Sequence, residues 1–379
     1  MKKKVITTVI GLFLSCFIYG MLLAEQPNYI RVNIIKGVSS LRLHIEGFYE
    51  VRSSCQGQIL YRGKDLNTTV TVYNGRILMG SINLRTNKAF IEARDQLILI
   101  NGRTFRGAIE FIREDNKYLS VVNYAELEDY IKGILYHEAS HYWPYEALKA
   151  QAVASRTYAV YQRQQSKNKD YDVTSDIYSQ VYGGRTSERD RTNKAVDMTK
   201  GQILVYREKV FPAYFHATCG GHTEDASLLW DIDIAPLKGV KCGFCKESPH
   251  SSWHYVLTKT EIKNKLSGTK YKISSISDVV ISGRDKSGRV TNLRILASGK
   301  DVVIPAKDFR HIIGPNIIRS TNFSVRSIKN DVIFEGIGWG HGVGMCQWGA
   351  YFMAKNGDTY DKILGYYYSG SQISSIADK

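Results

Sequence analysis

The chain has 379 residues, 43% of them hydrophobic, and carries a formal net charge of +15. This length and apolar content allow two domains with packed cores and exclude a chain too polar to fold on its own. The positive charge is spread along the sequence without a long basic block. It favours an anionic partner, namely a nucleic acid, an anionic lipid or an acidic wall polymer, and the alternative is a basic surface without such a partner.

Residues 1–24 have the pattern of an export segment. MKKK supplies a positive start, and the apolar run VITTVIGLFLSCFIYGMLLA follows and ends at Ala24. This pattern is typical of a secretory signal, and a run of about twenty residues also suits an uncleaved membrane anchor. Either way, we expect the working domain outside the cytoplasm, in the periplasm or cell wall, where nucleic acid is not its partner. Loss of the three lysines in this segment lowers the net charge from +15 to +12.

The following residues, 25–118, predict an N-terminal β-rich region. Short alternating runs such as IRVNII, LRLHI and TVTVY are separated by turn signals, among them Asn74-Gly75. A helical stretch is then expected over about 125–165, with an interruption at Trp143-Pro144.

Beyond Tyr206 the pattern is mostly β again. Runs such as VFPAYFHAT, SWHYVLT and VTNLRILASG precede a last helix, which we expect over 343–355 and which Asn356-Gly357 ends. The sequence therefore predicts an α+β fold, mostly β, with one buried central helix in a second domain over 119–373.

The central stretch opens with a pattern that also occurs in zinc peptidases. His137-Glu138-Ala139-Ser140-His141 fits H-E-x-x-H. A shared metal needs both histidines on a regular helix, with Glu138 as general base for the metal-bound water. Pro144 follows closely and disfavours helical geometry in the residue before it, and no third ligand follows at a recognisable spacing. A zinc peptidase is therefore the minor alternative.

The helix expected after Pro144 is rich in small residues on nearly every face. Its sequence, EALKAQAVASRTYA, is typical of a buried helix rather than an amphipathic one. Lys149 and Arg156 are seven residues apart and share one face. Two cations on such a helix mark either a solvated edge or the wall of a cleft that attracts negative charge.

Several stretches together resemble the SpoIID/LytB family, named for the stage II sporulation protein D. They are LEDYIKGILYHE, WPYEALKAQAVASRTYA, DIYSQVYGG and GIGWGHGVGMCQWGAYFMAKNG, within 127–370. The resemblance implies a SpoIID-like catalytic domain with lytic transglycosylase activity, which cuts peptidoglycan glycan strands without water and leaves 1,6-anhydro-MurNAc ends. It also implies that Glu138 is catalytic and that Lys149 and Arg156 are cations of the glycan cleft.

The chemistry of a lone glutamate suits this reaction. A leaving glycosidic oxygen is protonated by a carboxylic acid whose pKa an apolar pocket has raised. Ordinary glycosidases add a second carboxylate, whereas in a lytic transglycosylase the C6 hydroxyl of muramic acid attacks instead. Tyr142 and Trp143 can desolvate Glu138 and stack on sugar rings. Lys149 and Arg156 can pair with the lactyl carboxylate of peptide-free muramic acid.

The loop Gly340-His341-Gly342-Val343-Gly344 is not a nucleotide fingerprint, because no strand and later acidic residue accompany it. We therefore expect no cofactor for catalysis. The resemblance places this loop beside the cleft and suggests Trp339, His341 and Gln347 as substrate contacts, together with Gln180 of DIYSQVYGG. A tight turn with a purely structural role is the alternative.

Cys219, His222, Cys242 and Cys245 form two pairs with the spacing of a closed structural zinc site. His216 and His254 are substitute ligands. A disulfide is the rival interpretation for an exported chain, and free thiols are a third. Cys346 stands where the resembled family usually has serine, and its role is open.

Two hypotheses follow for the function. The first is a glycan-cleaving enzyme that acts on peptidoglycan strands during sporulation or division. The second is a non-catalytic scaffold that binds the cell wall and recruits or activates other wall enzymes.

Overall fold

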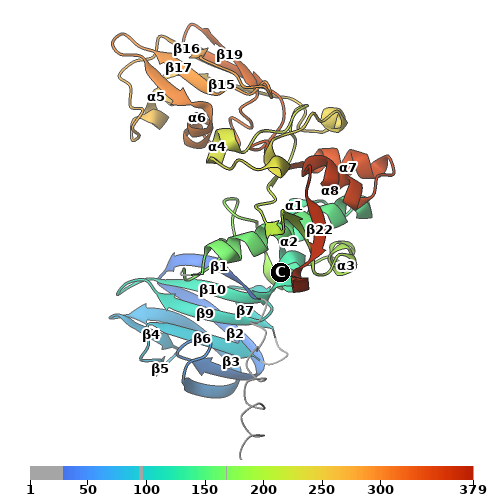
Figure 1. Ribbon diagram of the computed structural model, residues 1–379. Coiled ribbons are helices and arrows are strands. Elements are labelled where there is room, and N and C mark those ends of the chain that lie inside the picture. The colour runs from blue at the N-terminus through green and yellow to red at the C-terminus, as the bar shows by residue number, and fades with distance from the viewer. Residues whose placement is uncertain (1–28, 94–96, 168, 379) are drawn as a thin grey trace, which may run out of the picture.

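The computed structural model describes residues 29–93, 97–167 and 169–378, so the expected export segment lies outside the described residues. Three hydrophobic cores follow one another through the molecule. A large sheet lies at one end, helices occupy the middle, and a smaller α+β unit lies at the other end (Figure 1). The predicted α+β, mostly-β fold is confirmed.

The large sheet has eleven strands in the order β11-β1-β10-β9-β6-β2-β3-β4-β5, with β7 paired to β2 and β8. They are β1 (Tyr29–Val38), β2 (Ser40–Arg52), β3 (Ile59–Tyr73), β4 (Arg76–Met79), β5 (Ile82–Asn83), β6 (Lys88–Ala93), β7 (Ile98–Ile100), β8 (Arg103–Phe105), β9 (Ala108–Arg113), β10 (Leu119–Glu126) and β11 (Val173–Thr174).

Alternating side chains and tight turns explain this sheet. In β2, Leu41, Leu43 and Ile45 are buried on one face while their neighbours in the strand are more exposed. Asn74-Gly75 makes the predicted turn between β3 and β4, and both residues have the positive φ of a two-residue hairpin loop. The strands β9 and β10 pair across residue 118, so the sheet is continuous across the boundary expected there.

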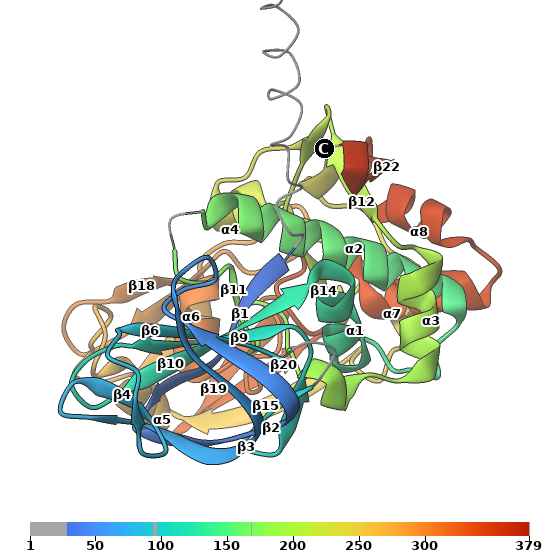
Figure 2. The same ribbon diagram turned by 90° about the horizontal axis from the view of Figure 1, so that it is seen from below.

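Two helices cross the middle of the molecule beside this sheet (Figure 1 and Figure 2). They are α1 (Leu127–Glu138) and α2 (Tyr145–Gln165), separated at Trp143-Pro144 as predicted. Most of α2 is buried, because Leu148 and Ala152 face the core of the large sheet while Ala150 and Val153 face the next core. A helix packed on both sides needs small residues all round, which accounts for its composition.

The second core is built from segments on both sides of a long insertion. Its elements are β12 (Gln202–Tyr206), β14 (Phe215–His216), α4 (Ser227–Trp230), β21 (Met345–Cys346), α7 (Gln347–Lys355), α8 (Tyr360–Tyr367) and β22 (Gln372–Ser375). On either side of β12 in the chain, α3 (Asp190–Met198) and β13 (Lys209–Val210) pack against the first core. The last long helix begins at Gln347 rather than at residue 343, because Met345 and Cys346 pair with β14 instead. Gly344 permits this approach, since its φ is 71° and a Cβ there would lie 1.9 Å from the carbonyl oxygen of Tyr214.

The inserted unit has its own core and was not predicted. It contains β15 (Trp253–Thr258), α5 (Lys259–Leu266), β16 (Asp278–Ile281), β17 (Asn292–Leu296), β18 (Val302–Pro305), α6 (Ala306–Ile313), β19 (Phe323–Ile328) and β20 (Asp331–Gly336). Two three-stranded sheets, β15-β20-β19 and β16-β17-β18, enclose buried residues such as Phe309 and Phe334. No helix in the described part of the chain has the length and hydrophobicity needed to cross a membrane.

Candidate active site

Glu138 is the last residue of α1. The α1 residues Tyr130, Ile134 and Leu135 are fully buried and hold the helix on the core. The helix ends because Ala139 has extended backbone, with φ −143°. Glu138 itself keeps partial solvent access. A rigid helix end thus presents one carboxyl group at a partly open position.

Burial raises the pKa of Glu138 from 4.5 to about 7. Hydrogen bonds from the Val181 backbone amide, at 3.3 Å from Oε1, and from the side chain of Gln347 oppose this rise without cancelling it. No second carboxylate and no cation is among the causes of the shift. A carboxyl group in these surroundings keeps its proton to a higher pH than a free glutamate does and can donate that proton.

Gln347 holds the N-terminus of α7 against the end of α1. Its Nε2 donates to the backbone carbonyl of Glu138 at 3.0 Å and to Oε1 of Gln151 at 3.3 Å. Gln151 in turn donates to the hydroxyl of Ser155. A chain of amide contacts therefore joins α1, α2 and α7 at the site, and the Gln347 amide is already engaged in it.

The loop that follows β11 supplies Val181. Gln180, expected as a substrate contact, is 1% exposed; it accepts from the Tyr130 hydroxyl at 3.0 Å. That expectation was wrong, because Gln180 points into the core and anchors the loop. The preceding Ile177 and Tyr178 are 69% and 73% exposed, and they form its open face.

Aromatic rings gather around Trp348, which directly follows Gln347 in α7. Trp143 packs against Trp348 and Tyr351, with ring centroids 5.2 Å apart in both pairs. Trp339 packs edge-on against His250 at 4.7 Å. Tyr142 makes few contacts and is 79% exposed.

His341 belongs to a separate group of rings with Tyr214 and Trp230, whose centroids lie 5.9 and 5.1 Å from its own. Tyr214 packs on Tyr158, and Tyr158 interacts electrostatically with Glu138. Burial lowers the pKa of His341 far below its usual value, so this ring is neutral at pH 7. The sequence analysis singled out neither tyrosine: Tyr158 lies in the quoted stretch WPYEALKAQAVASRTYA and Tyr214 in VFPAYFHAT, but no local pattern shows that their rings pack on one another.

The H-E-x-x-H residues are not brought together as potential metal ligands. Since α1 ends at Glu138, His141 lies beyond the helix, with its ring against Tyr142 at 3.9 Å. His137 instead contacts the Ser187 hydroxyl at 2.6 Å. Within the described ranges, the only set of three or more potential ligands close enough to share a metal lies elsewhere.

The two cations of α2 have structural partners. Arg156 has no exposed side-chain surface and makes a two-pronged ion pair with Glu128, at 2.9 and 2.7 Å, and it also donates to the Gln202 carbonyl. Its predicted role in a glycan cleft was wrong, since no substrate can reach it. Lys149 pairs with Glu146 at 2.5 Å and lies over the ring of Tyr360.

Four buried cysteines form the potential metal site. The Sγ atoms of Cys219, Cys242, Cys245 and Cys346 lie within 4.8 Å of one another. His222, predicted as the fourth ligand, is not in this group, and its Nδ1 lies 2.6 Å from the carbonyl oxygen of Thr223; Cys346 takes the fourth place instead. None of the five cysteines inside the described ranges is in a disulfide. Cys346 is 101 residues beyond Cys245, a spacing that no short motif reveals.

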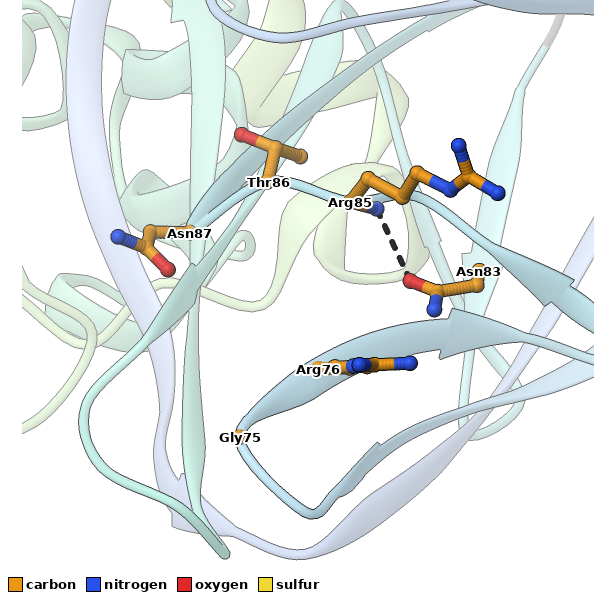
Figure 3. Close-up of a pocket in the computed structure, with 6 residues that line it drawn as sticks. All are labelled: Gly75, Arg76, Asn83, Arg85, Thr86 and Asn87. Atoms are coloured by element: carbon orange, nitrogen blue, oxygen red, sulfur yellow. Dashed lines mark hydrogen bonds between the residues drawn. The ribbon is translucent and has the colours of Figure 1, made fainter.

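Two surface hollows lie apart from Glu138 and its neighbours. One, of about 690 Å³, is lined by Gly75, Arg76, Asn83, Arg85, Thr86 and Asn87, and the Arg85 amide donates to Asn83 there (Figure 3). The other, of about 720 Å³, lies on the inserted unit beside Trp253 and Phe323. Neither contains the aromatic rings described above.

Comparison with known proteins identifies the family. Residues 115–206 match the family model described as Stage II sporulation protein. Stage II sporulation protein D of Bacillus subtilis is 35% identical over 265 residues, which cover 65% of this chain and 74% of that protein. This chain belongs to the SpoIID/LytB family. The membership confirms the resemblance seen in the sequence and supports a role related to the cell wall.

Further similarities bear on the remainder of this SpoIID/LytB chain. An uncharacterised protein of Brachyspira hyodysenteriae is 37% identical over 92% of this chain and 93% of its own length. The amidase enhancer of Bacillus subtilis is 29% identical over 80% of this chain, which spans half of that protein. Residues 241–344, which include the inserted unit, match a domain of unknown function (DUF8618).

Proposed function

We propose that this protein is a peptidoglycan lytic transglycosylase with Glu138 as its only catalytic carboxyl group. The observation that supports this most strongly is the pKa of Glu138, which burial raises to about 7 while no other carboxylate contributes. A glycosidase that activates water or forms a covalent intermediate needs a second carboxylate, typically about 5–10 Å away. A single protonated carboxyl group suits attack by a hydroxyl of the substrate itself better than attack by water or by an enzyme carboxylate.

The proton balance of the reaction needs no other group. The Glu138 carboxyl donates its proton to the oxygen that links C1 of MurNAc to GlcNAc, and the C1–O bond breaks. The C6 hydroxyl of the same MurNAc forms a new bond to C1 and returns its proton to the Glu138 carboxylate. The products are a free GlcNAc hydroxyl and a 1,6-anhydro-MurNAc end, with the enzyme regenerated and no water consumed.

The surroundings of Glu138 support a sugar polymer as substrate. Tyr142 and Tyr178 are exposed rings, and Trp143 and Trp339 are partly exposed. Faces of sugar rings pack well on such amphipathic side chains. The net charge of +15 fits an anionic wall polymer, and the apolar segment within 1–24 fits an extracytoplasmic location as a secreted or anchored protein. We expect peptide-free strands as the preferred substrate.

Mass spectrometry of purified glycan strands, with and without stem peptides, tests the proposal. The wild-type protein should release fragments with anhydro-MurNAc ends, faster from peptide-free strands, and Glu138→Gln should release none. Fragments with reducing ends, or equal release by Glu138→Gln, would contradict it.

A second function is favoured by the similarity to a protein named amidase enhancer. On that alternative, the protein binds the wall and activates another wall enzyme without cleaving glycan itself. Adding an amidase to wall sacculi with wild-type protein or with Glu138→Gln separates the two functions. Equal enhancement by both, together with no glycan fragments from either, would favour the activator.

A further inference from the structure

We propose that Cys219, Cys242, Cys245 and Cys346 bind one zinc ion, which fixes the start of α7 next to the candidate active site. This site differs from the sequence prediction in its fourth ligand. It also links three segments that are distant in the chain, namely the residues after β14, the turn at 242–245 and the β21–α7 junction. The proposal does not depend on the enzymatic activity suggested above.

The sulfur atoms have the spacing that a tetrahedral metal requires. A Zn–S bond of about 2.3 Å places the sulfurs of a tetrahedral site about 3.8 Å apart. The Sγ of Cys245 lies 3.4 Å from that of Cys219 and 4.0 Å from that of Cys242, and all four Sγ atoms lie within 4.8 Å of one another. Two disulfides would instead bring the sulfurs together as two pairs at about 2 Å. Four mutually close thiols favour a shared ion, to which each binds after releasing its proton.

The protein surrounds these sulfurs with hydrogen-bond donors. Backbone amides of Cys219 and Gly349 both donate to the Sγ of Cys346 at 3.3 Å, and the Tyr367 hydroxyl lies 3.2 Å from the Sγ of Cys242. Cys346 is also the N-cap residue of α7, whose positive end favours a thiolate there. Donors of this kind stabilise sulfur that carries negative charge.

A buried guanidinium group supplies the balancing charge. Arg289 is 1% exposed, and its Nη2 donates to the carbonyl of Cys219 at 2.7 Å, while its Nε and Nη1 have no hydrogen-bond partner. It forms a buried ion pair with Glu224 at 3.6 Å, and Cys219 and Cys346 are also among the groups that interact electrostatically with it. Zinc with four thiolates carries a charge of about −2, so the site offers this buried cation a second anionic partner beside Glu224.

Gly342 lets Arg289 approach the cluster. A Cβ at this position would lie 2.6 Å from the guanidinium carbon of Arg289, and its φ of 90° disfavours any other residue. The second glycine of the G-H-G-V-G loop is therefore needed for the packing of Arg289 beside the cluster, and not for the binding of a nucleotide.

The site bears on Gln347 through the chain itself. Cys346 directly precedes Gln347, whose amide holds the Glu138 carbonyl and Gln151. A metal that fixes Cys346 also fixes the backbone from which Gln347 reaches the end of α1. Loss of the metal should therefore loosen β21 and the first turn of α7 more than the end of α1.

X-ray absorption and elemental analysis of the untagged full-length protein test the site. We expect one zinc per chain with four sulfur neighbours at about 2.3 Å. Three sulfurs and one nitrogen would overturn Cys346 as a ligand and would favour a histidine such as His222 or His216. Absence of zinc, with disulfides between these cysteines found by mass spectrometry, would overturn the metal site altogether.

Matched variants and hydrogen exchange complete the test. His222→Ala and Cys55→Ser should retain the full zinc content, whereas Cys346→Ser should bind zinc at least tenfold more weakly. Should Cys346→Ser fail to fold, chelation of the wild-type protein replaces it. Amide exchange after chelation should rise at 345–350 while it stays unchanged at 127–135. Unchanged exchange at 345–350 in verified metal-free protein would overturn the role in fixing α7.

Discussion

Gln347 lies between two buried polar regions that differ in their access to water. On one side, Glu138 is partly exposed, and no charged group of the described residues is among those that shift its pKa. On the other side, four thiols are enclosed by Tyr367, backbone amides and Arg289. Burial stabilises the neutral form of a lone acid and leaves it able to give up a proton. Four enclosed thiols in mutual contact suit a permanent ion. The partly open region therefore suits chemistry, and the enclosed region suits rigidity.

The largest expected effect concerns the proton of Glu138. Glu138→Gln keeps the size of the side chain and removes its transferable proton, so the rate of glycan cleavage should fall by about a hundredfold to ten-thousandfold. His141→Ala is the matched control and should retain most of the activity, because His141 lies beyond α1 and does not share its helical face with His137. Loss of activity in both variants, with recovery on addition of zinc, would instead establish the peptidase-like metal site.

The helix that carries Glu138 is expected to depend on Arg156. Arg156→Ala leaves Glu128 without its buried partner and should lower the free energy of unfolding by about 3–5 kcal/mol. Lys149→Ala removes a more accessible pair on the same face of α2 and should cost about 1 kcal/mol or less. Urea denaturation measures both. A stable Arg156→Ala protein that had lost only substrate affinity would restore the cleft role rejected above.

The pH dependence of the cleavage rate and of the stability tests the role of Glu138. Since the pKa of Glu138 is raised to about 7, the acid is available below that pH, and the rate should fall about tenfold per pH unit above it. The protonated form also stabilises the fold. This contribution is complete below pH 4.5 and is lost as the pH rises through 7, so Glu138→Gln should be the more stable protein above pH 7, by at most about 3 kcal/mol. If the rate of glycan cleavage did not change between pH 6 and pH 9, a group other than Glu138 would be the proton donor.

The smallest expected effect concerns Gln347 itself. Its hydrogen bond lowers the pKa of Glu138, so Gln347→Met should raise that pKa. A hydrogen bond worth about 0.5–1.5 kcal/mol corresponds to a displacement of the alkaline limb by roughly 0.4–1 pH unit upward. The pH–rate profile of the variant measures this displacement, and zinc content serves as the control that the cysteine cluster is intact. A downward displacement would contradict the assigned contact.

The two regions also differ in how far the sequence predicts them. One continuous stretch of sequence contains Glu138, the helix that ends near it and the break at Trp143-Pro144. Local spacing and the family resemblance suffice to locate these features. Arg156 has the same sequence pattern as Lys149, and only the position of Glu128 on α1 shows that it is wholly buried. Cys346 joins the cysteine cluster through the return of the chain after the inserted unit, and its position depends on the pairing of β14 with β21, which no local pattern encodes. Arg289 reaches the cluster from within the inserted unit, between β16 and β17.

Cleavage of glycan strands in water labelled with oxygen-18 tests the central claim most directly. If Glu138 acts alone and the C6 hydroxyl of MurNAc attacks, the new ends lack one water and contain no label. The account predicts unlabelled anhydro-MurNAc ends from the wild-type protein. Labelled reducing ends would contradict it, because they require attack by an activated water instead of the C6 hydroxyl of MurNAc.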